Sequence, residues 1–168
     1  MQFKIGDKVV YPNHGIGVVE TIQHRHIAGR DEACYTLRIL SNDSTVMVPL
    51  SNLSTVGIRP VLRKRGVQNV LTFLKDARID LVGDWKGRYQ QNAEKMRSGE
   101  VEKVVEVFKS LSYLSSVKPL SYRERKMLDR ARFLVISELA EASQQPVGKI
   151  EEQVDQTLSV SLKSKLDH

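Results

Sequence analysis

The feature that most constrains the fold of this chain is a change of hydrophobic pattern near Pro60. Before that point, short runs rich in Val, Ile, Tyr and Thr alternate with Gly, Pro, Asn and Asp, which is typical of strands joined by turns. Beyond it, apolar residues recur at the three- and four-residue spacing of helices. The two patterns predict an α+β protein, with a small β domain over residues 1–59 and an all-α domain over residues 60–168.

The first domain is predicted to contain five short strands. They are expected at residues 8–11, 16–23, 33–40, 45–48 and 55–58. So many short strands in so short a segment favour a small antiparallel barrel, because closure of the sheet removes exposed strand edges. Gly15 and Gly17 look like the start of a dinucleotide-binding fingerprint, but the third glycine is missing and strand-like residues follow. We therefore interpret both glycines as turn residues of the sheet.

The second domain is predicted to contain four or five helices that pack as a compact bundle. Its clearest apolar stripe consists of Val101, Val104, Val105, Phe108 and Leu111. Pro119 is expected to end that helix, and Ser121 and Glu124 form a capping box that opens the next one. Asp84 is expected to cap a helix that begins at Trp85.

Charge is distributed unevenly along the chain, whose formal net charge is +6. Residues 1–58 hold five basic and five acidic side chains. Residues 59–97 hold ten basic and four acidic side chains, and residues 118–132 hold six and two. A basic excess confined to the helical half favours a polyanionic partner there, such as nucleic acid. The neutral β half is a poor candidate for phosphate binding, which needs an excess of cations.

Catalysis receives little support from the sequence. There is no Gly-Lys-Ser/Thr phosphate loop, and the acidic residues are spread over the predicted helices. The single cysteine, Cys34, excludes an intramolecular disulfide and is interpreted as a small buried hydrophobe. His24 and His26 share one strand face but lack a third ligand at a fitting spacing. We therefore expect a protein that is not an enzyme and that needs no metal or cofactor.

The sequence also predicts where the protein acts. Its longest uninterrupted apolar run is four residues, 133–136, which is too short to span a membrane. The first residues lack the apolar run of a signal peptide. We therefore expect a soluble cytoplasmic protein, and we expect it to be a monomer.

The only tryptophan, Trp85, stands at a predicted helix start beside Lys86 and Arg88. An exposed aromatic side chain there could stack on a base or wedge between base steps, while the cations hold the phosphates. The alternative is a core anchor, because Trp85 shares a helix face with Tyr89 and Met96. A second basic group on the next long helix consists of Arg123, Arg125, Lys126, Arg130 and Arg132.

Two sets of short motifs follow one another along the chain. The first set is FKIGDKVVYP at 3–12, HGIG at 14–17, VP at 48–49 and VGIR at 56–59. The second set is Trp85, RY at 88–89, EK at 94–95, SG at 98–99, LS at 120–121, ERKML at 124–128 and AR at 131–132. In this order and spacing, roughly residues 1–142 resemble the CarD family of bacterial transcription regulators.

The resemblance implies a Tudor-like RNA polymerase interaction domain followed by a helical DNA-binding domain. It implies that the protein binds the polymerase β subunit and promoter DNA, stabilises the open promoter complex and lies with the nucleoid. The positions that match polymerase-binding residues are Arg25, Met47 and Pro49, and Met47 stands where some relatives have a basic residue. Trp85 matches a residue that wedges into the minor groove. Together with the basic groups above, the candidate DNA-binding residues are Trp85, Lys86, Arg88, Arg125, Lys126 and Arg132.

Two alternatives stay open at this point. The first is a general architectural protein that binds DNA or RNA, although the neutral β domain is a poor phosphate-binding module. The second is an adaptor that binds polymerase but not DNA, as some branches of the family do. The pair Gln90 and Gln91 is relevant here, because some relatives have a basic residue after the Arg-Tyr motif.

Overall fold

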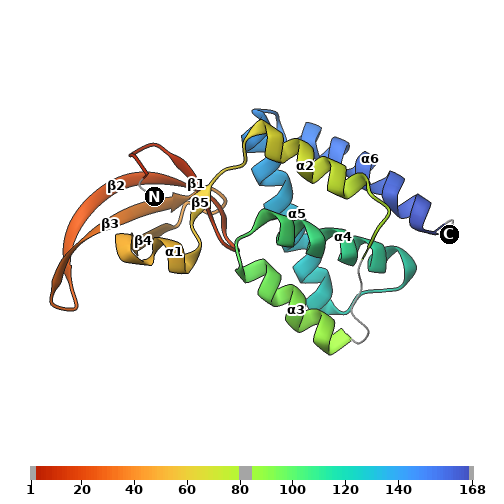
Figure 1. Cartoon of the computed structure of the whole chain (residues 1–168), viewed down its shortest axis with the longest axis horizontal. Coiled ribbons are helices and arrows are strands. Elements are labelled where there is room, and N and C mark those ends of the chain that lie inside the picture. Colours follow the sequence, from red (N-terminus) through yellow and green to blue (C-terminus); the bar gives the residue numbers. More distant parts are fainter. Residues whose placement is uncertain (1–2, 80–84, 167–168) are drawn as a thin grey trace. The chain divides into compact units, whose positions relative to one another are not determined.

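The computed structural model describes residues 3–79 and 85–166. The chain divides into two compact units, Met1–Val61 and Leu62–His168, which we call the β unit and the helical unit (Figure 1). Each unit has its own cluster of buried apolar side chains.

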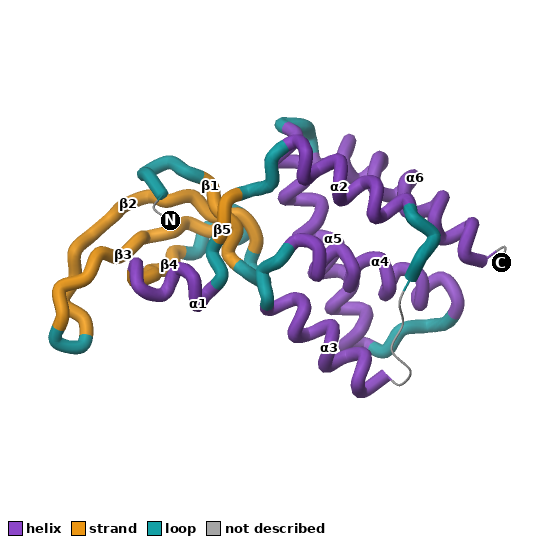
Figure 2. Tube along the Cα trace, viewed as in Figure 1, coloured by secondary structure: helices purple, strands orange, loops and turns teal. Residues whose placement is uncertain are grey.

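The β unit is a five-stranded antiparallel sheet in the order β4-β3-β2-β1-β5 (Figure 2). Its strands are β1 (Lys8–Tyr11), β2 (Gly15–Ile27), β3 (Arg30–Ile39), β4 (Thr45–Pro49) and β5 (Arg59–Pro60). The predicted order, an antiparallel sheet followed by helices, is confirmed. The predicted closed barrel is not found, because β4 and β5 are the two end strands of the described sheet and do not pair with each other.

One predicted strand is wrong, because most of residues 55–58 belong to a helical turn. A 3-10 turn, η1 (Leu50–Asn52), leads into α1 (Leu53–Val56). Gly57 then adopts a left-handed conformation with φ of 88°, which a residue with a Cβ rarely takes, and its N–H donates to the Leu53 carbonyl at 3.0 Å. This bond closes the turn, so the chain reaches the sheet edge only at β5, where Arg59 lies opposite Val10.

The core of the β unit lies on one face of the sheet. The register places Val19 opposite Leu37 and Tyr35 opposite Val48, so these side chains point to the same side. Phe3 joins them, and its N–H donates to the Tyr35 hydroxyl at 3.0 Å. Cys34 is fully buried, which confirms its interpretation as a small hydrophobe.

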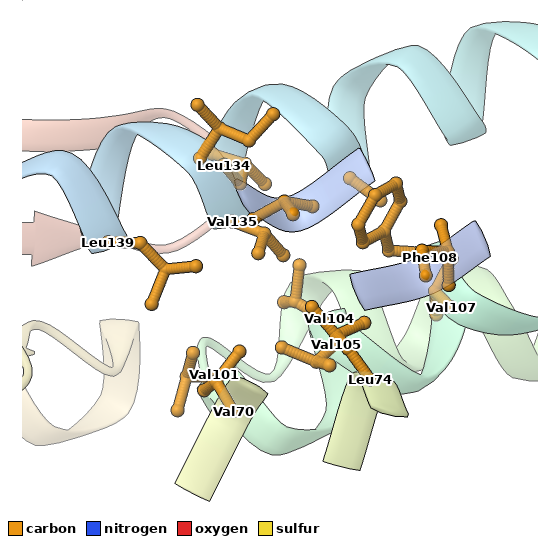
Figure 3. Close-up of a cluster of buried hydrophobic side chains, with 14 of the residues drawn as sticks. Val70, Leu74, Val101, Val104, Val105, Val107, Phe108, Leu134, Val135 and Leu139 are labelled. Atoms are coloured by element: carbon orange, nitrogen blue, oxygen red, sulfur yellow. The ribbon is translucent and has the colours of Figure 1, made fainter. Parts of the chain in front are cut away.

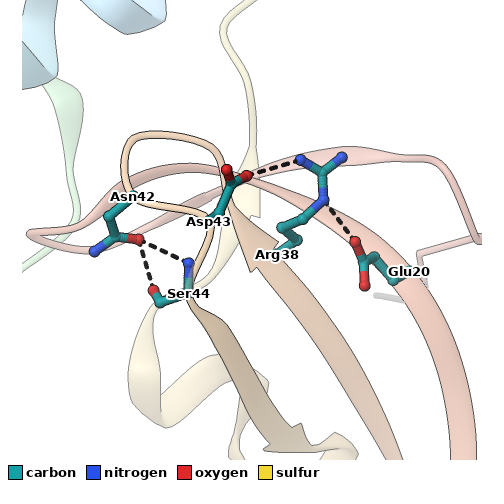
Figure 4. A network of polar contacts seen from close by, with 5 residues as sticks. All are labelled: Glu20, Arg38, Asn42, Asp43 and Ser44. Atoms are coloured by element: carbon teal, nitrogen blue, oxygen red, sulfur yellow. Dashed lines mark hydrogen bonds and ion pairs between the residues drawn. The ribbon is translucent and has the colours of Figure 1, made fainter.

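The predicted turn between the third and fourth strands is built from short polar contacts (Figure 4). Asn42 Oδ1 accepts bonds from the Ser44 N–H at 3.0 Å and the Ser44 hydroxyl at 2.7 Å. Arg38 Nε donates to Glu20 at 2.6 Å, and Arg38 Nη1 donates to Asp43 at 3.3 Å. The hydrogen bond with Glu20 is the largest cause of the raised pKa of Arg38. The Arg38–Glu20 contact joins β3 to β2, and the other contacts lie within the β3–β4 hairpin.

The helical unit contains α2 (Lys64–Lys75), α3 (Trp85–Arg97), α4 (Val101–Val117), α5 (Tyr122–Ser143) and α6 (Val147–Leu166). Its core forms where α2, α4 and α5 meet (Figure 3), with α6 packed against α2 and α5. Phe108 on α4 is almost fully buried and belongs to one cluster with Leu74 from α2 and Val135 from α5 (Figure 3). The apolar stripe predicted for α4 is therefore the centre of this unit.

Helix boundaries follow the signals in the sequence. Lys118 is extended and precedes Pro119, so α4 ends at Val117 as expected. The Ser121 hydroxyl accepts a bond from the Glu124 N–H at 3.2 Å, which confirms the Ser121 half of the predicted capping box, whereas the Glu124 carboxylate binds Arg88. Among the residues that the structure describes, no helix is both long and apolar enough to cross a membrane.

Candidate functional sites

The first candidate site lies where the start of α3 meets the start of α5. Arg88 Nε donates to Glu124 Oε2 at 2.9 Å, and Arg88 Nη2 donates to Glu124 Oε1 at 3.1 Å. Both side chains are buried, with exposed fractions of 6 % for Arg88 and 3 % for Glu124. This bidentate pair joins two basic segments whose contacting residues are 36 positions apart in the sequence.

Aromatic rings support two cations at the same junction. The Arg123 guanidinium lies 4.5 Å from the centre of the Tyr89 ring, which is a second contact between α5 and α3. The Lys126 ammonium lies 4.8 Å from the centre of the Tyr122 ring, and Tyr122 is 70 % exposed. Both cations are exposed although they lie over rings, so they are accessible to an anion.

The predicted DNA-binding residues fall into two groups. Lys86 on α3 and Arg125 and Lys126 on α5 are exposed, and none of the three forms an ion pair with another described residue. Arg88 and Arg132 already have acidic partners. Arg132 donates to both carboxylate oxygens of Asp155 on α6, at 2.5 and 3.1 Å. That hydrogen bonding is the largest cause of the raised pKa of Arg132.

Trp85 is the first residue of α3 by its backbone. Its side chain lies outside the described part of the structure, as does the whole of Asp84, its predicted helix cap. The wedge and core-anchor interpretations of Trp85 therefore both stay predictions.

The second candidate site lies on the face of the sheet opposite the Val19–Leu37 pair. Arg25 is opposite Glu32, Met47 is opposite Thr36, and Pro49 is opposite Cys34. The alternation of side chains along paired strands puts Arg25, Met47 and Pro49 on this one face. Arg25 is exposed, Met47 is 42 % exposed and Pro49 is partly buried.

Glu32 holds the neighbouring segment in place beside Arg25. Its carboxylate accepts a hydrogen bond from the Ser51 N–H at 3.0 Å, at the η1 turn that follows β4. Hydrogen bonds from the Ser51 side chain and backbone lower the pKa of Glu32. The Glu32 carboxylate is thus bound to Ser51. Arg25 Nη2 donates instead to Gln23 Oε1, at 3.1 Å.

Sequence reasoning missed the roles of two buried charged side chains, one at the candidate site and one in the core of the helical unit. Glu124 was assigned to the capping box, yet its carboxylate binds Arg88; only the contact across the bundle reveals this role. Lys109 is 2 % exposed and donates from Nζ to the Phe73 carbonyl at 2.7 Å. The sequence contained a sign that Lys109 is buried, because position 109 lies four residues after Val105 on the apolar side of α4. Within the described residues, no cluster of three or more metal-ligating side chains occurs.

Comparison with known proteins gives a consistent result for both units. Residues 3–62 match the family model described as "CarD-like/TRCF RID domain", and residues 69–155 match "CarD, C-terminal domain". A Bacillus subtilis (strain 168) protein named "Putative transcription factor YdeB" is 34 % identical over 137 residues, which are 82 % of this chain and 90 % of that protein.

Solved structures of two Myxococcus xanthus domains are also similar in sequence. The N-terminal domain of CarD, solved by NMR, is 36 % identical and covers 35 % of this chain and 79 % of its own, with a TM-score of 0.32. The domain described as CdnLNt is 42 % identical and covers 37 % of this chain and 87 % of its own, also with a TM-score of 0.32. The matches to family models over both units and to the Bacillus protein along most of the chain show that this protein belongs to the CarD family of transcription regulators.

Proposed function

We propose that this protein binds the β subunit of bacterial RNA polymerase through residues 1–59 and promoter DNA through residues 60–168, and that it stabilises the open promoter complex. One observation carries the DNA-binding half of the proposal. The Arg88–Glu124 pair joins the starts of α3 and α5, so the exposed cations of two separate basic segments lie within two residues of one junction.

The exposed side chains beside this junction have the composition of a phosphate-binding site. Lys86, Arg125 and Lys126 are exposed and have no acidic partner among the described residues, and Tyr122 presents an exposed ring beside them. Cations of this kind neutralise phosphates without reading the base sequence, so they bind any duplex that polymerase presents. Trp85, at the start of the same α3 helix, is proposed as the residue that wedges into the minor groove.

The proposed polymerase-binding surface has a different composition. Arg25 offers a charge-assisted contact to a carboxylate, and Met47 and Pro49 offer apolar contacts on β4, an end strand of the sheet. Since the β unit as a whole is neutral, this mixed surface fits a protein partner better than a nucleic acid. The description of the matching family model, which is shared with TRCF proteins, is consistent with a protein-interaction role for the sheet.

The first experiment separates the two interfaces. Binding of the full chain to polymerase and to a promoter duplex is measured for Arg25→Glu, Lys126→Met and the parent. Arg25→Glu should weaken polymerase binding only, and Lys126→Met should weaken DNA binding only. Lys4→Glu, an exposed substitution outside the strands with the same charge change as Arg25→Glu, is the matched control and should bind polymerase normally.

The outcomes also separate the alternatives. Polymerase binding without any DNA affinity would support an adaptor, and loss of DNA affinity in Arg25→Glu would support an architectural protein that uses its sheet. The wedge is tested by Trp85→Ala, with a thermal melt beside the open-complex lifetime on one promoter. A wedge predicts a shorter lifetime at nearly unchanged melting temperature, whereas a core anchor predicts a loss of about 3–5 kcal/mol of stability.

A further inference from the structure

We infer that Arg88 and Glu124 are a positioning pair for the proposed DNA surface, and that Arg88 itself does not bind phosphate. The inference rests on the proposed function, since it concerns how Lys86 on α3 and Lys126 on α5 are held at one spacing. The sequence predicts that all six candidate residues contact DNA. We infer instead that some of them bind DNA and that Arg88 holds the binding residues in position.

The guanidinium of Arg88 is already occupied. Its Nε and Nη2 donate to the two oxygens of one carboxylate, and both partners are more than nine-tenths buried. To reach a phosphate, Arg88 would have to leave Glu124 buried without its partner. Removal of one member of a buried ion pair is strongly unfavourable, whereas a phosphate gains the same contact from an exposed lysine at little cost.

The spacing of residues along each helix shows which side chains face the neighbouring helix and which are free to meet DNA. Lys86 and Arg88 are two residues apart on α3, so their side chains point to roughly opposite sides of the helix. The same spacing separates Glu124 from Lys126 on α5. The inner member of each couple therefore faces the other helix, and the outer member is exposed. Fixing the inner pair fixes the separation of the outer cations.

The ends of both helices are held firmly enough for this role. The Ser121 hydroxyl accepts the Glu124 N–H and so fixes the residue that carries the carboxylate. Arg123 over the Tyr89 ring adds a second contact between α5 and α3, one residue along from the ion pair on each helix. Two contacts between the helices, side by side, restrict both sliding and rotation of α3 on α5.

A positioning role and a simple charge effect predict opposite changes in DNA affinity when the Glu124 carboxylate is removed. A carboxylate close to bound phosphates repels them, so its removal alone should tighten DNA binding. If Glu124 positions the cations, its removal should instead weaken binding. The decisive variant is Glu124→Gln, which keeps the shape and the backbone cap of α5 but removes the charge that holds Arg88. Asp129→Asn, an exposed carboxylate on the same helix, is the matched control.

The experiment measures binding of the full chain to a short fluorescent duplex over a salt series, at a temperature where thermal melts show every variant to be folded. Glu124→Gln should bind roughly three- to tenfold more weakly, comparable to loss of one hydrogen bond, with the salt dependence of the parent. Asp129→Asn should bind as the parent does or slightly more tightly. Unchanged or tighter binding by Glu124→Gln would overturn the inference, because Glu124 would then merely mask a phosphate-binding arginine.

A double variant keeps the test valid if the single variants unfold. Arg88→Met with Glu124→Leu replaces the buried pair by apolar side chains, an exchange that often preserves stability. It should regain the melting temperature lost in Arg88→Met and keep the parent's salt slope. A slope shallower by about 0.9, as expected for Lys126→Met, would show that Arg88 does bind phosphate. A parent chain with no DNA affinity would refute the proposed function itself, and the positioning role with it.

Discussion

Lys109 offers a sharp test of how the helical unit is stabilised. Its buried Nζ donates to the Phe73 carbonyl at 2.7 Å and lies 4.5 Å from the centre of the Phe73 ring. Phe73 belongs to the last turn of α2, where carbonyls lack an N–H partner within the helix. Lys109 on α4 therefore caps α2 from a neighbouring helix. Lys109→Met keeps an unbranched side chain of similar length but removes the donor and the charge.

The expected loss follows from these contacts. A hydrogen bond from a charged donor contributes about 1.5–3 kcal/mol, and an ammonium over a ring contributes about 0.5–2 kcal/mol. The substitution also removes the cost of burying an ammonium, which offsets part of that sum. We expect Lys109→Met to lower the free energy of unfolding by about 2 kcal/mol. For a helical unit of this size, that loss corresponds to a fall of roughly 10 °C in melting temperature.

The assay is thermal unfolding of the full chain followed by circular dichroism at the helical signal. Lys103→Met is the matched control, because Lys103 is an exposed lysine on the same helix whose ion pair, within the part of the chain that the structure describes, is the i,i+3 contact to Glu100 at 3.2 Å. We expect the control to lose no more than about 0.5 kcal/mol. A Lys109→Met protein that melts at or above the parent temperature would refute the reasoning, since burial of the ammonium would then cost more than its contacts supply.

Three further predictions concern other parts of the molecule. Arg132→Met should lower stability by at most about 1 kcal/mol in a thermal melt, because its pair with Asp155 is partly exposed, and should leave the salt slope of DNA binding unchanged. Glu32→Gln should flatten the pH dependence of the β unit's melting temperature between about pH 5 and pH 3. Hydrogen bonds from Ser51 lower the pKa of Glu32, so its carboxylate stabilises the fold at higher pH and this is lost as pH falls. Gly148→Ala should raise stability by roughly 0.5–1 kcal/mol, because an added Cβ in α6 meets nothing within 4 Å; a lower melting temperature would contradict this.

Much of the fold could be predicted because its signals are local. The Ser121 cap, the end of α4 before Pro119 and the strands around the first turns follow from residues a few positions apart. The error at residues 55–58 is also instructive. A run of Thr, Val and Ile favours a strand, but the left-handed Gly57 closes a helical turn over Leu53, and a closed turn cannot add to the sheet. Closure of the sheet was predicted from strand number alone, although it depends on which end strands meet.

The sequence predicted which basic residues belong to the candidate site, but not which of them are exposed and which are held by acidic partners. The sequence identified Lys86 and Arg88 beside the lone tryptophan, and Lys126 in a second basic group, as candidate DNA-binding cations without distinguishing their roles. Which of them is exposed depends on how α3 packs against α5, and the ion pair that joins these helices connects residues 36 positions apart. Charge counts along the chain contain no information about such pairs.

The sequence by itself determined the two-part organisation, the helical positions and the confinement of basic charge to the second half, because periodicity, capping and composition are properties of neighbouring residues. Only the tertiary structure decided that the sheet is open, that Arg88 and Arg132 are engaged by Glu124 and Asp155, and that Lys109 is buried as a cap. Each of these depends on burial and on a partner distant in sequence. A side chain's charge is fixed by its chemistry, but whether it meets solvent, a phosphate or a carboxylate is fixed by what packs against it.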